Sequence, residues 1–185
     1  MFDLERFISE KLNSAYRAHY AVWVCWWPAW RKISGRNILR KWEQGNLIQE
    51  GQTVLDYGCG TGSFTIPAAR IVSTRGKVYA LDYFPRQLEI VEQQSTKEKL
   101  TNIETILSDS QTGLPDECID VIWMCDVIHE IKERRAVLEE LHRVLKKEGI
   151  LAIYDGMGAK VLNYATGLFS LTERDGKLFK FVKAK

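Results

Sequence analysis

Glycine and proline are scarce in this sequence, with 13 and 4 among 185 residues, and no sign of charge dominates, since 26 Lys+Arg stand against 24 Asp+Glu. Low Gly and Pro together with 45% hydrophobic residues excludes a disordered or collagen-like chain. A net charge of +2 gives no overall attraction to nucleic acid. We therefore expect one folded domain, residues 1–185, without a nucleic-acid partner.

Cysteines are also few and lie far apart, at Cys25, Cys59, Cys118 and Cys125, without a C-x-x-C pair. This spacing argues against a zinc site and against the disulfide framework of a small secreted protein. We expect no metal ligands. Free thiols predict a cytoplasmic location, where the environment keeps cysteine reduced.

Long hydrophobic runs are missing as well. The apolar run 21–30 has ten residues, about half of the roughly 20 that a membrane-spanning helix needs. A signal peptide is disfavoured because Asp3 and Glu5 precede this run and no small-residue cleavage site follows it.

From residue 53 onward, short β-like runs alternate with longer helical ones. Apolar strands that alternate with helices predict a parallel sheet covered on both faces. Near the end, residues 168–172 and 178–182 flank an Asp-Gly pair, which indicates an antiparallel hairpin. The other expected strands are 53–57, 77–82, 103–107, 119–124 and 150–154, and the expected helices are 64 to about 75, 85–99, 132–146 and 160–164.

A glycine-rich turn joins the first of these strands to its helix, with glycines at 58, 60 and 62. Glycine tolerates positive φ and admits a ligand close to the backbone, and a helix N-terminus offers free N–H groups. The dinucleotide fingerprint G-x-G-x-x-G is not met, because Ser63 stands where it needs glycine. Asp56, just before the turn, disfavours a pyrophosphate and favours an ammonium or sulfonium group.

Two further carboxylates follow the next strands. Asp82 ends the second strand, where an acidic side chain can accept hydrogen bonds from ribose hydroxyls, and Asp109 follows the third. With Asp56, they predict a ligand that has a ribose and several donors but no phosphates. Each residue also has a structural alternative: the glycines form a tight turn only, Asp82 caps a helix, and Asp109 is an ordinary turn residue.

With these features the chain resembles the class I S-adenosylmethionine-dependent methyltransferases, and among them the menaquinone/ubiquinone-biosynthesis group. The similar segments are VLDYGCGTG (54–62), ALDYFP (80–85), 107–131 and 141–155. The resemblance implies a Rossmann-like, doubly wound, seven-stranded, mostly parallel α/β sheet with an antiparallel C-terminal hairpin strand. It also implies S-adenosylmethionine as cofactor.

Carried over by position, the resemblance assigns each part of the cofactor to a place in the chain. Asp56 and the three glycines face the methionine part, Asp82 holds the ribose with Tyr83 beside the adenine, and Asp109 with Ser110 holds the adenine amino group. The expected cofactor-binding residues are Tyr16, Asp56, Tyr57, Gly58, Gly60, Gly62, Asp82, Tyr83, Asp109, Ser110, Met124 and Cys125.

Methyl transfer from a sulfonium needs mainly positioning and desolvation of the acceptor, and it requires no metal. A general base is needed only for a hydroxyl or an acidic carbon. The candidates follow the fourth strand and are Asp126, His129 and Glu130. His129 is preferred because histidine titrates near neutral pH, with a structural role for it as the alternative. Cys59 is interpreted as a small filler of the turn, and Asp120 as structural.

The substrate side is expected from residues 1–45, a helical cap placed before a core of residues 46–185. Four of the six tryptophans lie within 23–30, in the stretch Lys11–Trp42, which has seven Lys/Arg and no Asp or Glu. Their aromatic face either packs on the core, lines a pocket for an apolar or aromatic acceptor, or contacts a membrane surface or a second copy, so monomer and homodimer both stay open.

The leading functional hypothesis is methyl transfer to a small molecule. One alternative is methylation of a macromolecule, a tRNA or a protein, although no N/D-P-P-Y/F motif follows the fourth strand. The other alternative is a non-catalytic, cofactor-binding partner subunit.

Overall fold

The computed structural model describes residues 47–184. The expected cap, residues 1–45, and with it Tyr16, lies outside them. The helices of the described part are α4 (Thr65–Val72), α5 (Pro85–Glu98), α6 (Arg134–Val144) and α7 (Lys160–Ala165). The strands are β1 (Thr53–Tyr57), β2 (Lys77–Asp82), β3 (Ile103–Leu107), β4 (Ile119–Cys125), β5 (Leu145–Tyr154), β6 (Phe169–Asp175) and β7 (Leu178–Lys183).

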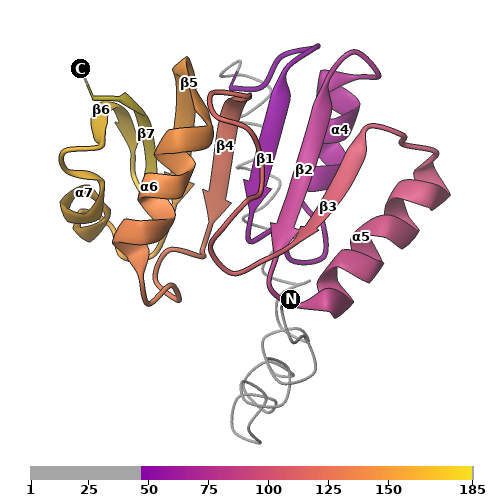
Figure 1. Cartoon of the computed structure of the whole chain (residues 1–185), viewed down its shortest axis with the longest axis horizontal. Coiled ribbons are helices and arrows are strands. Elements are labelled where there is room, and N and C mark those ends of the chain that lie inside the picture. The colour runs from indigo at the N-terminus through magenta and orange to yellow at the C-terminus, as the bar shows by residue number, and fades with distance from the viewer. Residues whose placement is uncertain (1–46, 185) are drawn as a thin grey trace, which may run out of the picture. The chain divides into compact units, whose positions relative to one another are not determined.

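These strands form one seven-stranded sheet in the order β3-β2-β1-β4-β5-β7-β6 (Figure 1). Strands β1 to β5 are parallel to their neighbours, and β7 is antiparallel to both β5 and β6. The strand order reverses between β1 and β4, which is the point where open α/β sheets bind ligands. The predicted doubly wound α/β sheet with an antiparallel C-terminal strand is confirmed.

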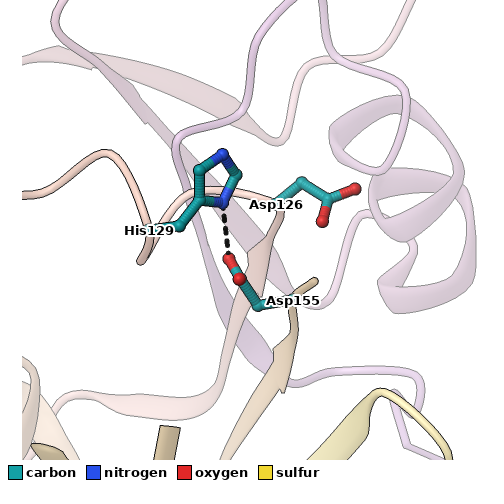
Figure 2. A group of neighbouring side chains, drawn as sticks. All are labelled: Asp126, His129 and Asp155. Carbon is teal, nitrogen blue, oxygen red and sulfur yellow. Dashed lines mark hydrogen bonds and ion pairs between the residues drawn. The ribbon is translucent and has the colours of Figure 1, made fainter. Parts of the chain in front are cut away.

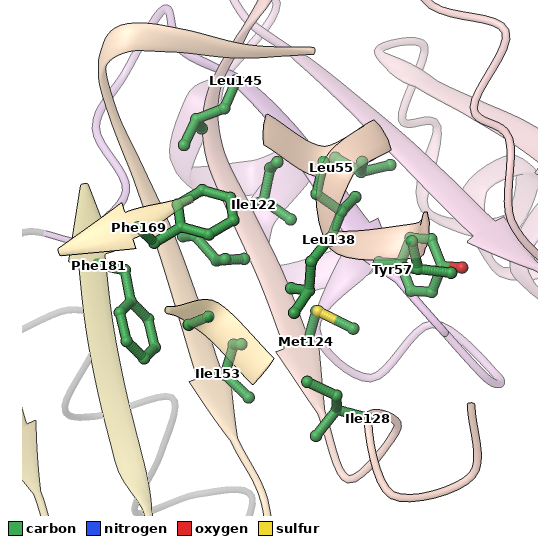
Figure 3. Packing of buried hydrophobic residues seen from close by; sticks show 14 of the residues in the cluster. Leu55, Tyr57, Ile122, Met124, Ile128, Leu138, Leu145, Ile153, Phe169 and Phe181 are labelled. Atoms are coloured by element: carbon green, nitrogen blue, oxygen red, sulfur yellow. The ribbon is translucent and has the colours of Figure 1, made fainter. Parts of the chain in front are cut away.

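Both faces of the sheet are covered, as the apolar strands require. On one face, Leu55, Ile122 and Ile153 pack with Leu138 of α6 and with the aromatic rings of β6 and β7 (Figure 3). On the other face, α4 and α5 lie over β1, β2 and β3, and Val91 of α5 is fully buried. Successive residues of β1 therefore point to opposite layers.

The boundaries around residue 145 differ from the expected ones. Helix α6 ends at Val144, and β5 begins at Leu145 instead of residue 150. The Lys-rich segment favours a helix C-terminus by itself, but Leu145 is buried and pairs with Ile119, and Lys146 Nζ lies 2.7 Å from Asp120 Oδ1. Tertiary pairing thus overrides the local preference.

Asp120 has the structural role that its place in the sequence indicated. Besides Lys146, it accepts a hydrogen bond from Thr53 N at 2.9 Å, and so it joins the starts of β1, β4 and β5. Among the described helices, none combines the length and the apolar character that crossing a bilayer would take.

Candidate functional site

The glycine-rich turn leaves β1 with left-handed backbone at all three glycines, with φ of 74° at Gly58, 53° at Gly60 and 83° at Gly62. A Cβ on Gly58 would lie 2.4 Å from Val127 Cγ2, so this position has no room for a side chain. Around Gly60 no described atom lies within 4 Å of such a Cβ. The turn is thus packed at Gly58 and open at Gly60.

Asp82 ties this turn to the end of β2. Its Oδ2 accepts from Gly60 N at 2.9 Å, and its Oδ1 accepts from Phe84 N at 2.9 Å. Burial raises the pKa of this carboxyl, and the backbone N–H groups partly oppose that rise. The helix N-cap position of α5 belongs to Phe84, without a side-chain cap bond, so Asp82 is not the capping residue.

Two residues of β1 support the neighbouring strand ends. Asp56 is 2% exposed, and its Oδ2 accepts from Thr65 Oγ1 at 2.6 Å, which fixes the first turn of α4. Tyr57 is buried on the opposite face and donates its hydroxyl to Asp109 O at 2.9 Å. The loop after β3 is thereby held against β1, while the Asp109 side chain stays exposed and accepts from Ser110 Oγ.

At the end of β4 the chain passes from buried to accessible residues. Met124 and Cys125 are buried, and Asp126, half-buried, takes a left-handed conformation with φ of 51°. Its N–H donates to Tyr154 O at 2.8 Å, which holds the ends of β4 and β5 together.

His129 and Asp155 meet at this edge (Figure 2). His129 Nδ1 lies 2.9 Å from Asp155 Oδ2, and the dashed line of Figure 2 marks this contact. The Asp155 side chain is 0% exposed and that of His129 36% exposed. Asp155 follows β5, and its second oxygen accepts from Met157 N at 2.8 Å. The contact therefore joins a partly exposed imidazole to a buried carboxylate that has a polar partner at each of its two oxygens.

Asp126 completes this group of side chains. Asp126, His129 and Asp155 offer ligand atoms that all lie within 4.8 Å of one another, a set that a metal ion could use. Burial raises the pKa of Asp126, the nearby charge of Asp155 raises it further, and His129 and Lys177 oppose the rise. Two acidic groups and one imidazole thus share a small volume.

Arg134, at the start of α6, holds the loop that carries His129. Its Nε donates to Ile128 O and its Nη2 to His129 O, both at 2.8 Å. A guanidinium that spans two successive carbonyls fixes the loop in one conformation.

The predicted residues lie along the carboxyl edge in the order of the strands. Asp109 and Ser110 follow β3, Asp82 and Tyr83 end β2, the glycine turn follows β1, and Asp126 and His129 follow β4. The rings of Tyr83 and Phe84 lie against each other at an interplanar angle of 38°, with centroids 3.8 Å apart. Cys59 is buried, and burial raises the pKa of its thiol, which suits a filler of the turn.

The sequence patterns assigned no role to Asp155, Thr65 or Arg134. For Asp155 the signal was available, because it follows a strand as Asp109 does. Thr65 and Arg134 act through tertiary hydrogen bonds, which the spacing of residues in the sequence does not predict.

The fold agrees with comparisons to known proteins. Residues 48–174 match the methyltransferase domain family. Demethylmenaquinone methyltransferase of Geobacillus stearothermophilus is 33% identical over 122 residues, which cover 65% of this chain and 49% of that protein. The chain spans about half the length of the curated relatives that it matches.

Two solved structures extend the comparison. A SAM-dependent methyltransferase from Aquifex aeolicus is 29% identical with a TM-score of 0.65, over 74% of this chain and 83% of that one. Coclaurine N-methyltransferase bound to N-methylheliamine and SAH is 27% identical with a TM-score of 0.56, over 63% and 34%. The chain therefore belongs to the methyltransferase domain family and has the fold of its S-adenosylmethionine-dependent enzymes.

Proposed function

We propose that this protein binds S-adenosylmethionine at the carboxyl edge of its sheet and transfers the methyl group to a small, apolar or aromatic acceptor. The observation that carries the proposal is the pair of hydrogen bonds that the Asp82 carboxylate accepts from Gly60 N and Phe84 N. It fixes a buried carboxylate beside an open, left-handed glycine, at the strand-order reversal of a methyltransferase-family sheet.

The residues of the turn fit such a cofactor. Beyond the space at Gly60, the Ser63 Oγ is buried and has no hydrogen-bond partner among the described residues, so a polar ligand group could satisfy it. A carboxylate has about four lone-pair sites, and Asp82 uses part of them on the backbone N–H groups of Gly60, Tyr83 and Phe84, which leaves capacity for a ribose hydroxyl.

The other cofactor-binding positions follow from the order of the strands. We assign the adenine to Asp109 and Ser110 with Tyr83 beside it, and the methionine part to the region of Asp56, Gly58, Gly62, Met124 and Cys125, with Tyr57 as support. The cofactor supplies an electrophilic methyl group on a sulfonium. The chain supplies orientation, exclusion of water and, at Asp126 and His129, groups that can hold a proton.

The acceptor is proposed as a small molecule because two of the relatives are named for small-molecule acceptors. These acceptors are demethylmenaquinone and coclaurine. We further propose that residues 1–45, which lie outside the described residues, supply the acceptor pocket through their tryptophans.

Calorimetric titration tests the cofactor, and a methyl-release assay with quinols, phenols, amines and thiols tests the acceptor. We expect binding of S-adenosylmethionine and of its demethylated product, and turnover with one of these classes. Lack of binding to both forms would overturn the proposal. Binding without turnover on any small molecule or on tRNA would instead favour the non-catalytic subunit.

The role of Asp82 has its own test. Asp82→Asn keeps the shape of the side chain but removes its charge, so the cofactor Kd should rise by about 10- to 30-fold, as for the loss of charge-assisted hydrogen bonds. Asp116→Asn is the matched control, because Asp116 is an exposed carboxylate that pairs with Arg143. An unchanged Kd in the folded Asp82 variant would refute the ribose assignment.

A further inference from the structure

We infer that Asp155 is a positioning residue that holds His129 as a general base, so the acceptor is one that must lose a proton from the atom that is methylated. This inference rests on the proposed function and deepens it. It concerns a residue outside the strand-end positions assigned to the cofactor.

The geometry of the pair is that of an oriented base. Asp155 Oδ2 lies 2.9 Å from His129 Nδ1, and Asp155 Oδ1 accepts from Met157 N at 2.8 Å, so the carboxylate is held at both oxygens. It is fully buried, whereas the imidazole is partly exposed. An ionised carboxylate can accept hydrogen bonds but cannot donate them. Asp155 therefore selects the histidine tautomer that has its proton on Nδ1.

That tautomer leaves the lone pair on Nε2, the nitrogen that points away from Asp155 in Figure 2. The ring is also held from behind, since Arg134 fixes the carbonyls of Ile128 and His129. A nitrogen acceptor on a fixed ring, backed by a buried carboxylate, is the arrangement that removes a proton from a bound nucleophile.

Several charged groups lie around the ring. Asp126 faces it from the end of β4, and Glu130 Oε1 lies 3.8 Å from its Nε2. Lys177, in the β6–β7 turn, acts on Asp126 with the opposite sign, and Tyr154 lies near Asp126 at the end of β5. With Asp155 these make three carboxylates near the ring, and the Arg134 guanidinium, which donates to His129 O, adds a second positive charge besides Lys177.

In the step itself, His129 Nε2 takes the proton from the acceptor atom, and the electron pair of that bond forms the new bond to the methyl carbon. The carbon–sulfur bond breaks with its electron pair on sulfur, which becomes a neutral thioether. The positive charge thus moves from the sulfonium to the imidazolium. Hydroxyl, acidic carbon and ammonium acceptors meet this description, and a thiolate does not.

The first measurement requires no cofactor and no activity. A long-range ¹H–¹⁵N spectrum of the full chain reports the tautomer of each of its 3 histidines, and His129→Gln identifies the relevant signals. We expect the Nδ1–H tautomer at His129 in the unmodified protein. The Nε2–H tautomer there would overturn the inference, whatever the outcome of the cofactor titration.

The second measurement uses Asp155→Asn. We expect kcat to fall by on the order of 10²-fold, with the cofactor Kd within about twofold, since the base and not the cofactor site is disturbed. Asp155→Glu should restore part of the rate.

Asp120→Asn is the matched control, because Asp120 is a partly buried strand residue with two structural bonds on the opposite edge of the sheet. It should lower thermal stability and leave the His129 spectrum and kcat unchanged. If Asp155→Asn behaves like this control, Asp155 is only structural and the inference fails. If the spectrum shifts as expected but no cofactor binds, the pair stands and the proposed function fails.

Discussion

Buried and half-buried carboxylates in this chain differ in what compensates their charge. Glu140 is 5% exposed, and it accepts from Arg143 and from both the backbone and the hydroxyl of Thr112. The Arg143 guanidinium is the main cause that lowers the pKa of Glu140 to about 2. Asp82, with backbone donors only, has its pKa raised by burial. One carboxylate therefore stabilises the fold, and the other keeps free capacity for a ligand.

For Glu140 this difference predicts a pH-dependent contribution to stability. Its pKa is depressed on folding, so the contribution is present above about pH 4.5 and is lost as pH falls toward 2. Glu140→Gln should lower the free energy of unfolding by about 2 to 3 kcal/mol at pH 7. Urea unfolding at pH 7 and pH 3 measures it, and the gap between the two proteins should shrink by more than half at pH 3. An equal gap at both pH values would contradict this origin.

At the scale of elements, the β1–α4 turn separates packing from ligand access. Gly58→Ala places a Cβ against Val127 and strains a left-handed residue, so stability should fall by roughly 2–4 kcal/mol. The Cβ of Gly60→Ala meets no described atom within 4 Å, so the free energy of unfolding should fall by only about 1–2 kcal/mol. The loss of free energy of cofactor binding in this variant should be larger than that loss of stability. Thermal unfolding measures the stability of both variants, and calorimetric titration measures their cofactor affinity. Equal losses of stability and of affinity in the two variants would refute the contrast.

How far the sequence predicts an element depends on whether its pattern is local. The β1 strand and its turn follow from apolar residues ended by three glycines, and the structure has them where expected. Residues 145–149 could not be assigned that way, because their strand conformation comes from pairing with β4. Asp155 shows the same limit within the site: its position at a strand end was visible, but its contact with His129 needs two segments 26 residues apart to meet.

At the scale of the whole molecule, the sheet orders the proposed chemistry from one side to the other, with adenine over β3 and the proton acceptor between β4 and β5. The strand order predicts that cofactor binding and proton removal can be disturbed separately. Asp82 ends β2, Asp155 follows β5, and they share no described hydrogen-bond partner, so their variants should affect Kd and kcat independently.

Metal removal gives a further prediction for the whole protein. Asp126, His129 and Asp155 could hold a divalent ion, but the His129–Asp155 contact at hydrogen-bond distance accounts for both groups without one. A sulfonium already carries the positive charge that a Lewis acid would supply. We therefore expect turnover within about twofold of the untreated rate after dialysis against EDTA. Loss of activity that Mg²⁺, Mn²⁺ or Zn²⁺ restores would show that the three residues bind metal instead.

The antiparallel direction of β7 has a consequence for how such an enzyme could diversify. Because β7 runs opposite to β5, the turn at Gly176 and Lys177 returns to the carboxyl edge, where Lys177 O accepts from Asp155 N at 3.2 Å. This turn therefore lies beside the residue that we propose to position the general base. Insertions there would change what is methylated while the methyl source stays the same, which makes the hairpin a natural starting point for directed evolution of new acceptors.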